Sequence, residues 1–210
     1  MTQTIKEKIR NLADEYALIL EKKMAERVFE MSSDDNSHHL IYQVLGVRET
    51  EGELIDIYQN KGRFLYKYAG AFLEKATILC FSEMFPEAKK FYVENTIGKR
   101  PKNFEIDCLI FNEAIEIKWR DATTDGDHIT KEHTRIRVIK DFGFKPIRLM
   151  FYLPNREQAR RIQAALKTLY DGIGGEYYAG QAVWDYLQSR TEINLQQILF
   201  EIVEERLQNE

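Results

Sequence analysis

The sequence contains no apolar run that approaches the roughly 18 residues needed to cross a bilayer, so we expect no membrane partner. It has only two cysteines, Cys80 and Cys108, and both lie in apolar surroundings. This favours small core side chains in a reducing compartment over a disulfide framework. The opening stretch MTQTIKEKIRNLADEY is charged throughout and lacks the apolar core of a signal peptide. We therefore expect a cytoplasmic protein.

The composition is typical of a folded globular protein. Hydrophobic residues make up 44% and charged residues 30% of 210 residues, which is enough for one well-buried domain. The net charge of −4 at first sight disfavours a nucleic-acid partner, but residues 97–161 hold 14 Lys and Arg against 10 Asp and Glu. A phosphate-binding surface needs a basic face and not a basic protein. Chance explains this local excess equally well, so charge alone leaves the partner open.

Hydrophobic periodicity predicts a mixture of helices and strands. The predicted helices cover residues 2–31, 63–85, 129–142, 155–170, 180–189 and 192–207, and the predicted strands cover 89–98, 104–111, 114–119 and 145–153. Residues 40–62 stay unassigned. The glycine-rich stretch DGIGGEYYAG (171–180) does not follow a predicted strand, so we interpret it as a flexible turn and not a phosphate cradle. Asn155, with Gln158 three residues later, is interpreted as the start of a helix.

Two predicted strands carry charged residues among apolar ones. In FEIDCLIF the apolar residues alternate onto one face and leave Asp107 on the other, and in AIEIKW Glu116 and Lys118 share a face. If residues 112–113 form the turn, Asp107 faces Lys118 directly and Glu116 lies one diagonal away, ~7 Å between Cβ atoms. Two carboxylates at that spacing can hold one hard cation such as Mg²⁺, with Lys118 beside it to orient or deprotonate a water. The alternative interpretation is the solvent face of a sheet or a cross-strand ion pair.

The order of these residues resembles a known nuclease motif. Asp107, followed by Glu-Ile-Lys at 116–118, is similar to the PD-(D/E)xK motif, on a predicted α-β-β-β-α-β core. The proline that often precedes the first Asp is absent, since the sequence there reads Glu-Ile-Asp. Such nucleases often take a further acid from the first core helix, and Glu74 in GAFLEKA is the candidate by its placement. The alternative for Glu74 is a helix-surface residue paired with a nearby lysine.

Beyond the motif, the stretches EIKWRDATTDGDHITKEHTR and GEYYAGQAVWDYL resemble type II restriction endonucleases, in particular the ApaLI-like branch. The resemblance implies an α/β fold with a mixed central sheet flanked by helices. It implies a single restriction-endonuclease-like domain over residues 1–210, with a catalytic core at about 63–153. Helical additions would then occupy residues 1–62 and 155–210.

The same resemblance implies an activity and the residues that carry it. The activity is Mg²⁺-dependent hydrolysis of double-stranded DNA at a short specific site, with Mn²⁺ able to substitute for Mg²⁺. Such enzymes are usually homodimers that read a palindrome. The resemblance makes Asp107, Glu116 and Lys118 catalytic, and makes Asp107, Glu116 and Glu74 the metal ligands.

Candidates for DNA contact lie in the polar stretch after the second motif strand and in two basic strips. Arginine and lysine can contact guanine or phosphate, and a carboxylate can accept a hydrogen bond from cytosine. The alternative for each candidate is a solvated surface residue. The candidates are Lys99, Arg100, Lys102, Arg120, Asp121, Thr123, Thr124, Asp125, Asp127, His128, Lys131 and Arg135. Residues 121–132 also resemble a calcium-binding loop, but Thr123 and His128 depart from that pattern.

Two other functions stay open. A repair or junction-resolving nuclease on the same core would share the three motif residues but would cut according to DNA structure. A non-catalytic DNA-binding or interaction module would use the same acids in a surface ion-pair network. Mg²⁺-dependent cleavage at discrete sites separates these possibilities.

Overall fold

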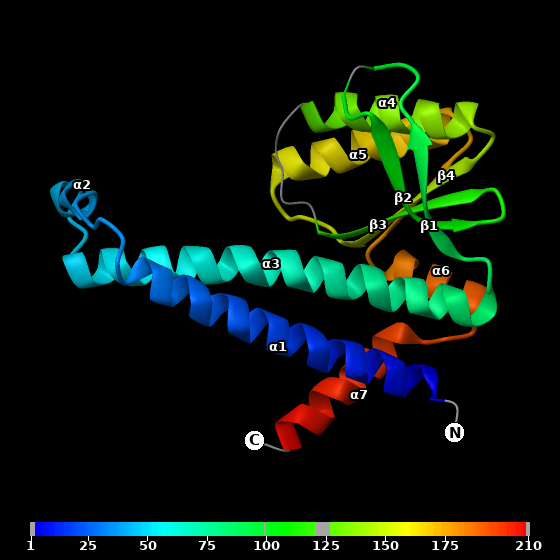
Figure 1. Ribbon diagram of the computed structural model, residues 1–210. Helices are drawn as coiled ribbons and strands as arrows, with labels where there is room; N and C mark the ends of the chain where they lie inside the picture. The colour runs from blue at the N-terminus through cyan, green and yellow to red at the C-terminus, as the bar shows by residue number, and fades with distance from the viewer. Residues whose placement is uncertain (1–2, 99, 121–126, 209–210) are drawn as a thin grey trace. The chain divides into compact units, whose positions relative to one another are not determined.

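The computed structural model describes residues 3–98, 100–120 and 127–208, with the backbone alone described at positions 127 and 128. Figure 1 shows the order of the elements along the chain. They are α1 (Ile5–Met31), α2 (His39–Val44), α3 (Glu49–Met84), β1 (Lys89–Glu94), β2 (Asn103–Ile110), β3 (Glu113–Arg120), α4 (Asp127–Asp141), β4 (Lys145–Tyr152), α5 (Glu157–Gly172), β5 (Glu176–Ala179), α6 (Gln181–Thr191) and α7 (Leu195–Gln208).

The chain divides into two compact units, which are described separately. One unit comprises Met1–Ile9 and Leu73–Glu210 and contains the whole sheet, and the other comprises Arg10–Phe72. The organisation of residues 1–210 as one domain stays a prediction.

In the described part of the chain the sheet is mixed and has five strands in the order β1-β2-β3-β4-β5. β1, β2 and β3 are antiparallel neighbours, and β4 and β5 continue the sheet in parallel with β3. Helix α4 supplies the crossover that the parallel pair β3 and β4 requires. From α3 to β4 the elements follow the predicted order α-β-β-β-α-β.

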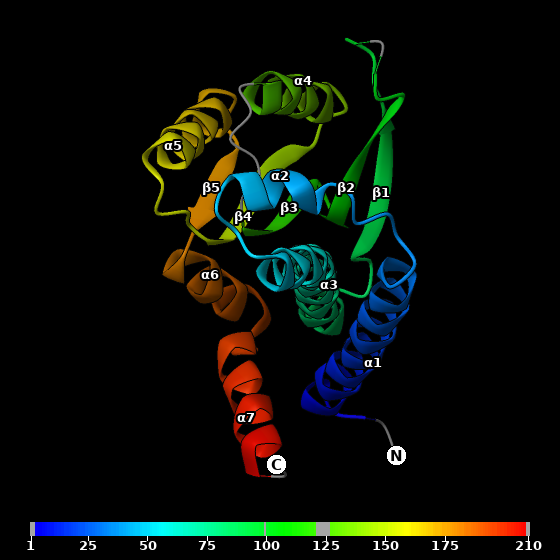
Figure 2. The same cartoon turned by 90° about the vertical axis from the view of Figure 1, so that its left-hand side faces the viewer.

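Helices cover both faces of the sheet. α4 and α5 lie together over one face (Figures 1 and 2), and α6 covers the other, where Trp184 packs against Phe151 of β4 at a ring-centroid distance of 4.5 Å. The last turns of α3 add three side chains that are fully buried, Ala76, Cys80 and Phe81. Because both faces are covered, β3 and β4 are buried along most of their length.

Both cysteines are core residues of the sheet-containing unit. Cys80 and Cys108 are buried, free thiols, as predicted, and burial raises the pKa of each to about 12. Neither is therefore a reactive thiolate at neutral pH. Among the described residues, every helix is too short or too polar to span a bilayer.

One extra residue in β2 changes which of its side chains share a face. Lys89 of β1 lies opposite Leu109, but Phe91 lies opposite Ile106, so β2 takes three steps where β1 takes two. This β-bulge falls at residues 107–108. Bulges bend a strand and re-aim side chains, often next to active sites.

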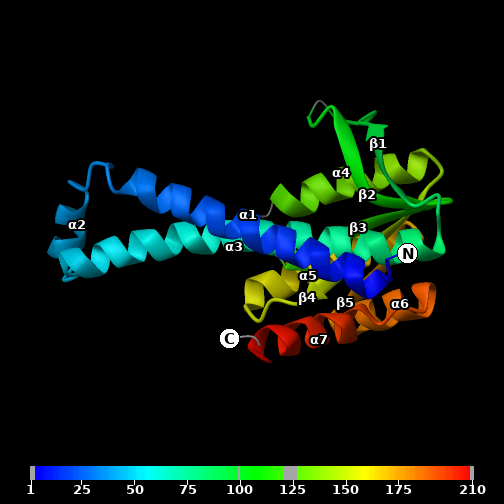
Figure 3. The ribbon, with the colours of Figure 1, turned by 60° about the horizontal axis from the view of Figure 1, so that its bottom comes forward.

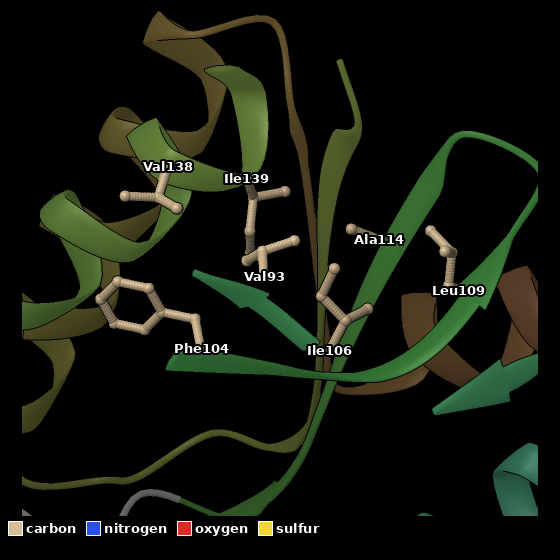
Figure 4. Close-up of a cluster of buried hydrophobic side chains, with 7 residues drawn as sticks. All are labelled: Val93, Phe104, Ile106, Leu109, Ala114, Val138 and Ile139. Carbon is tan, nitrogen blue, oxygen red and sulfur yellow. The ribbon is translucent and has the colours of Figure 1, made fainter. Parts of the chain in front are cut away.

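The bulge also determines the composition of a hydrophobic cluster between the sheet and α4. Figure 4 shows the cluster, which consists of Val93, Phe104, Ile106, Leu109, Ala114, Val138 and Ile139. Leu109 therefore shares a face with Phe104 and Ile106. The prediction that Cys108 and Ile110 share that face is wrong, because strict alternation does not continue through a bulge.

The hairpin between β2 and β3 turns one residue earlier than predicted. Ile110 pairs with Glu113, and the ladder of paired residues continues as far as Cys108. The predicted register, with Asp107 opposite Lys118, is therefore wrong. Continued by one residue, the observed register sets Asp107 opposite Glu116.

A fifth strand replaces part of the predicted flexible turn. β5 lies within residues 171–180 and pairs in parallel with β4. A Cβ atom at Gly175 would lie 2.6 Å from the backbone oxygen of Pro146, closer than real Cβ atoms approach. The glycine there allows the chain to enter the sheet directly beside β4.

Two helix boundaries also differ from the prediction. α3 begins at Glu49 and not near residue 63, so most of the unassigned stretch 40–62 is helical. The residue before α5 is Arg156, and no side chain caps this helix. The interpretation of Asn155 as a capping residue is therefore wrong.

The ends of the sheet-containing unit meet outside the sheet. The first turns of α1 lie beside α7 (Figure 3), where Lys6 pairs with Glu205 at 3.2 Å and Ile9 is fully buried. In the second unit, α1 from Arg10 onward and α3 as far as Phe72 form an antiparallel helical pair, with α2 at their turn (Figure 1). Tyr16 and Tyr68 pack edge to face in this pair, with ring centroids 6.4 Å apart.

Candidate active site

Three motif side chains come together at the splayed end of the β2–β3 hairpin. Lys118 Nζ lies 3.8 Å from Asp107 Oδ2 and makes a direct ion pair with Glu116. The two carboxylate side chains are only 7% exposed, whereas the lysine side chain is 38% exposed. The two acids are therefore buried in the sheet, whereas the ammonium group of Lys118 is partly exposed to solvent.

The backbone fixes the orientation of the first acid. Asp107 lies in the bulge of β2, just beyond the last residue that pairs with β3. Its Oδ2 atom accepts a hydrogen bond of 2.8 Å from the backbone N–H of Ile117. A side-chain oxygen thus takes the place of a strand carbonyl as acceptor, which holds the carboxylate between the two strands.

The second acid is held by a buried arginine. Arg135 of α4 makes an ion pair with the Glu116 carboxylate, and its Nη2 atom also donates to the backbone oxygen of Glu105 at 2.6 Å. Burial lowers the pKa of the Arg135 guanidinium, but an arginine stays protonated at neutral pH. Glu116 therefore carries a fixed positive partner on the helix side and Lys118 on the open side.

Arg135 also belongs to a wider network of buried polar side chains. Glu132 accepts hydrogen bonds from Arg148 at 3.1 Å and from the hydroxyl of Tyr170 at 2.6 Å, and it lies 3.7 Å from Arg135. Arg148 pairs with Glu116 in the β3–β4 register and is 2% exposed. Burial is the largest single influence on the pKa of Arg148 and acts to lower it, but the Glu132 carboxylate, together with Tyr170 and Tyr177, keeps that pKa above its ordinary value.

Asp107 also belongs to a second group of acids. Carboxylate oxygens of Glu74, Glu105 and Asp107 lie within 4.8 Å of one another, which is close enough for a shared cation. Lys90 Nζ bridges two of them, at 3.3 Å from Glu74 and 2.6 Å from Glu105. The Lys90 ammonium, and after it the hydroxyl of Tyr92, lowers the pKa of Glu105.

Sequence reasoning found one of the two additional acids and missed the other. Glu74 of α3 lies beside Asp107, and it also shows the alternative contact with a nearby lysine, Lys90. Glu105 was not a candidate, although it precedes Asp107 by two residues on the same strand, a spacing that could have indicated it.

A comparison with known protein families identifies the family of the chain. The sequence model described as "ApaLI-like restriction endonuclease" matches residues 1–204. The chain belongs to the ApaLI-like restriction endonuclease family. A search of the curated proteins and a search of the solved structures each found no match.

Membership in the ApaLI-like family confirms the resemblance carried by the stretches EIKWRDATTDGDHITKEHTR and GEYYAGQAVWDYL. The mixed five-stranded sheet flanked by helices is the restriction-endonuclease-like fold that the resemblance implied. The family is one of restriction endonucleases, so this ApaLI-like chain is assigned as a nuclease. The acids gathered around Asp107 supply the oxygen ligands that a divalent cation prefers.

The predicted DNA contacts have different surroundings in this ApaLI-like chain. Arg100, Lys102, Arg120 and Lys131 are exposed, whereas Arg135 points inward to Glu116. Seven further candidates lie outside the described residues, or have side chains that do; these are Lys99, Asp121, Thr123, Thr124, Asp125, Asp127 and His128. All twelve DNA contacts stay predictions.

Proposed function

We propose that the chain is a type II restriction endonuclease that cleaves double-stranded DNA at a specific sequence in the presence of Mg²⁺. The observation that carries this proposal is the convergence of Asp107, Glu116 and Lys118 at the open end of a β-hairpin. Membership in the ApaLI-like family supports it.

The side chains around Asp107 fit a hard divalent cation. Carboxylate oxygens are the ligands that Mg²⁺ prefers, and Mn²⁺ accepts the same set. Lys90 and Lys118 each bring a positive charge against these acids, which is the electrostatic role that a bound cation would take over. Asp107 and Glu116 would hold the ion, with Glu74 as a third ligand. Glu105 is added here as a neighbouring acid.

Individual residues of the chain would have different roles in phosphodiester hydrolysis. A bound Mg²⁺ supplies Lewis acidity toward the phosphate and lowers the pKa of water. Lys118 Nζ hydrogen-bonds the attacking water and offsets the negative charge that builds on the phosphate. The water oxygen forms the new bond to phosphorus and the bond to the 3′ oxygen breaks. The water gives up one proton to solvent, and solvent returns one proton to the 3′ oxygen. Arg135 holds the Glu116 carboxylate in its orientation through their ion pair.

A surface pocket next to the end of β3 supports DNA binding close to this site. Its volume is about 630 Å³, and its lining includes Trp119, Arg120, Tyr152 and Arg156. Cationic and aromatic side chains together suit contact with phosphates and bases. We propose that bound DNA lies over this pocket and extends to Lys118. We further propose a homodimer, because a two-fold symmetric site is read most simply by a two-fold symmetric protein.

Digestion of phage DNA tests the proposed function. We expect discrete fragments in Mg²⁺, no cleavage in excess chelator, and restored cleavage after Mg²⁺ or Mn²⁺ is added back. Sequencing the fragment ends would then give the recognition site and the cut position.

The same digest separates the alternatives. A smear, or cutting confined to branched DNA, would favour a repair or junction-resolving nuclease. Binding of DNA with no cleavage in either metal would favour a non-catalytic module. Either result would contradict the proposal of a type II enzyme.

A further inference from the structure

A cluster of metal-ligating side chains lies in the second unit, where α2 meets α3. His38 Nε2 lies 2.9 Å and His39 Nε2 lies 3.1 Å from the same oxygen, Oδ2 of Asp56. Ligand atoms of the three residues all lie within 4.8 Å of one another. His39 is 4% exposed, so the cluster is partly enclosed.

The other ring nitrogen of His38 constrains what the cluster can bind. His38 Nδ1 lies 3.2 Å from the backbone oxygen of Asp35, an atom that can only accept a hydrogen bond. A neutral His38 therefore carries its proton on Nδ1 and directs the lone pair of Nε2 at the Asp56 carboxylate. Two lone pairs that face each other need either a proton on Nε2 or a metal ion between them. Histidines that ligate metals commonly donate their second N–H to a backbone carbonyl in this way.

The carboxylate is also oriented as metal-binding carboxylates are. The hydroxyl of Tyr42 donates to Asp56 Oδ1 at 3.0 Å, which leaves Oδ2 to face the two imidazoles. The Tyr42 ring stacks on His39 at a centroid distance of 5.4 Å. A tyrosine that holds both the carboxylate and one imidazole fixes the outer shell of the site.

The distances from Asp56 Oδ2 to the two imidazole nitrogens suit a tetrahedral ion. Bonds of about 2.0–2.2 Å from zinc to nitrogen or oxygen set neighbouring ligand atoms roughly 3.3–3.5 Å apart in a tetrahedron. The observed distances of 2.9 and 3.1 Å need only a small expansion to reach that value. A pocket of about 210 Å³ adjoins His39 and Asp56 and leaves room for water as a fourth ligand.

We propose that His38, His39 and Asp56 form a zinc site that links α2 to α3. Two imidazoles and one carboxylate suit Zn²⁺ and do not suit Mg²⁺, which prefers oxygen ligands. The zinc site is therefore chemically distinct from the carboxylate group around Asp107. Its role is structural, since it joins the start of a six-residue helix to a long one.

Metal titration of the full, tag-free chain tests this proposal. The protein is stripped with a chelator, dialysed into excess Mg²⁺ to saturate carboxylate sites, and titrated with Zn²⁺ or Co²⁺. We expect one equivalent of Zn²⁺ per chain, and with Co²⁺ the intense visible absorption of a tetrahedral site. Asp56→Asn and the double change His38→Gln, His39→Gln should weaken Zn²⁺ binding by ~100-fold or more.

His133→Gln is the matched control, because His133 is an exposed histidine on α4, in the unit that does not contain the cluster. It should bind Zn²⁺ as the wild type does, and circular dichroism should show that each variant is folded. Absence of stoichiometric Zn²⁺ binding in the wild type would overturn the proposal whether or not the variants fold. Equal binding by the wild type and by a folded double variant would also overturn it, because the Zn²⁺ would then be bound by other residues.

Discussion

Replacing Asp107 or Lys118 with alanine is expected to abolish DNA cleavage while leaving sequence-specific binding measurable. Asp107→Ala removes the acid shared by both carboxylate groups, and Lys118→Ala removes the only ammonium group that contacts Glu116 in the described part of the chain. Loss of one group that stabilises the transition state typically costs about 10²–10³ in rate. Single-turnover cleavage of a labelled duplex, together with gel-shift binding in Ca²⁺, would measure the two effects.

Two exposed residues provide controls for these substitutions. Asp141→Ala at the end of α4 and Lys22→Ala on α1 remove the same charges from surface positions, and both should cleave at the wild-type rate. Thermal unfolding would verify that each variant is folded. Cleavage by a folded Lys118→Ala at the rate of these controls would contradict the catalytic role of the lysine.

Arg135→Met is expected to destabilise the protein by about 3–5 kcal/mol. Removing one partner of a buried ion pair leaves an uncompensated charge, and here both Glu116 and Glu132 lose their contact with the same guanidinium. Urea unfolding measures the loss of free energy. Cleavage should fall as well, because Glu116 loses the partner that orients it.

The matched control for this change is Arg137→Met, two residues along α4 on its exposed side. It should leave the free energy of unfolding within about 0.5 kcal/mol of the wild type. If Arg135 acts instead as a phosphate contact, Arg135→Met would weaken DNA binding and leave stability unchanged. That outcome would contradict the positioning role and favour the original prediction of DNA contact.

The sequence predicted the order of the elements from α3 to β4, and it named the three residues that converge at the candidate site. Alternation in the two motif strands and helical spacing before and after them were sufficient, because both strands and helices keep their periodicity over several residues. Charged residues such as Glu116 and Lys118 within an otherwise buried strand were the strongest local signal.

Features that depend on distant parts of the chain were not predictable in this way. The bulge at residues 107–108 is visible only when β2 is paired with β1. It places Leu109, and not Cys108, on the same face of the sheet as Ile106. The glycine-rich stretch became β5 because Gly175 fits closely against Pro146. Arg135 was a candidate for DNA contact by its place in the sequence. In the structure its side chain is mostly buried and contacts Glu116 and Glu132.

The position of a bound metal ion tests the central claim most directly. Lys118→Ala would be crystallised with uncut cognate DNA and Mn²⁺, and the ion would be located by its anomalous scattering. We expect a peak bonded to carboxylate oxygens of Asp107 and Glu116 and adjacent to the phosphate at the cut position. Bound DNA whose scissile phosphate lies away from these two acids, or Mn²⁺ bound elsewhere, would contradict the claim.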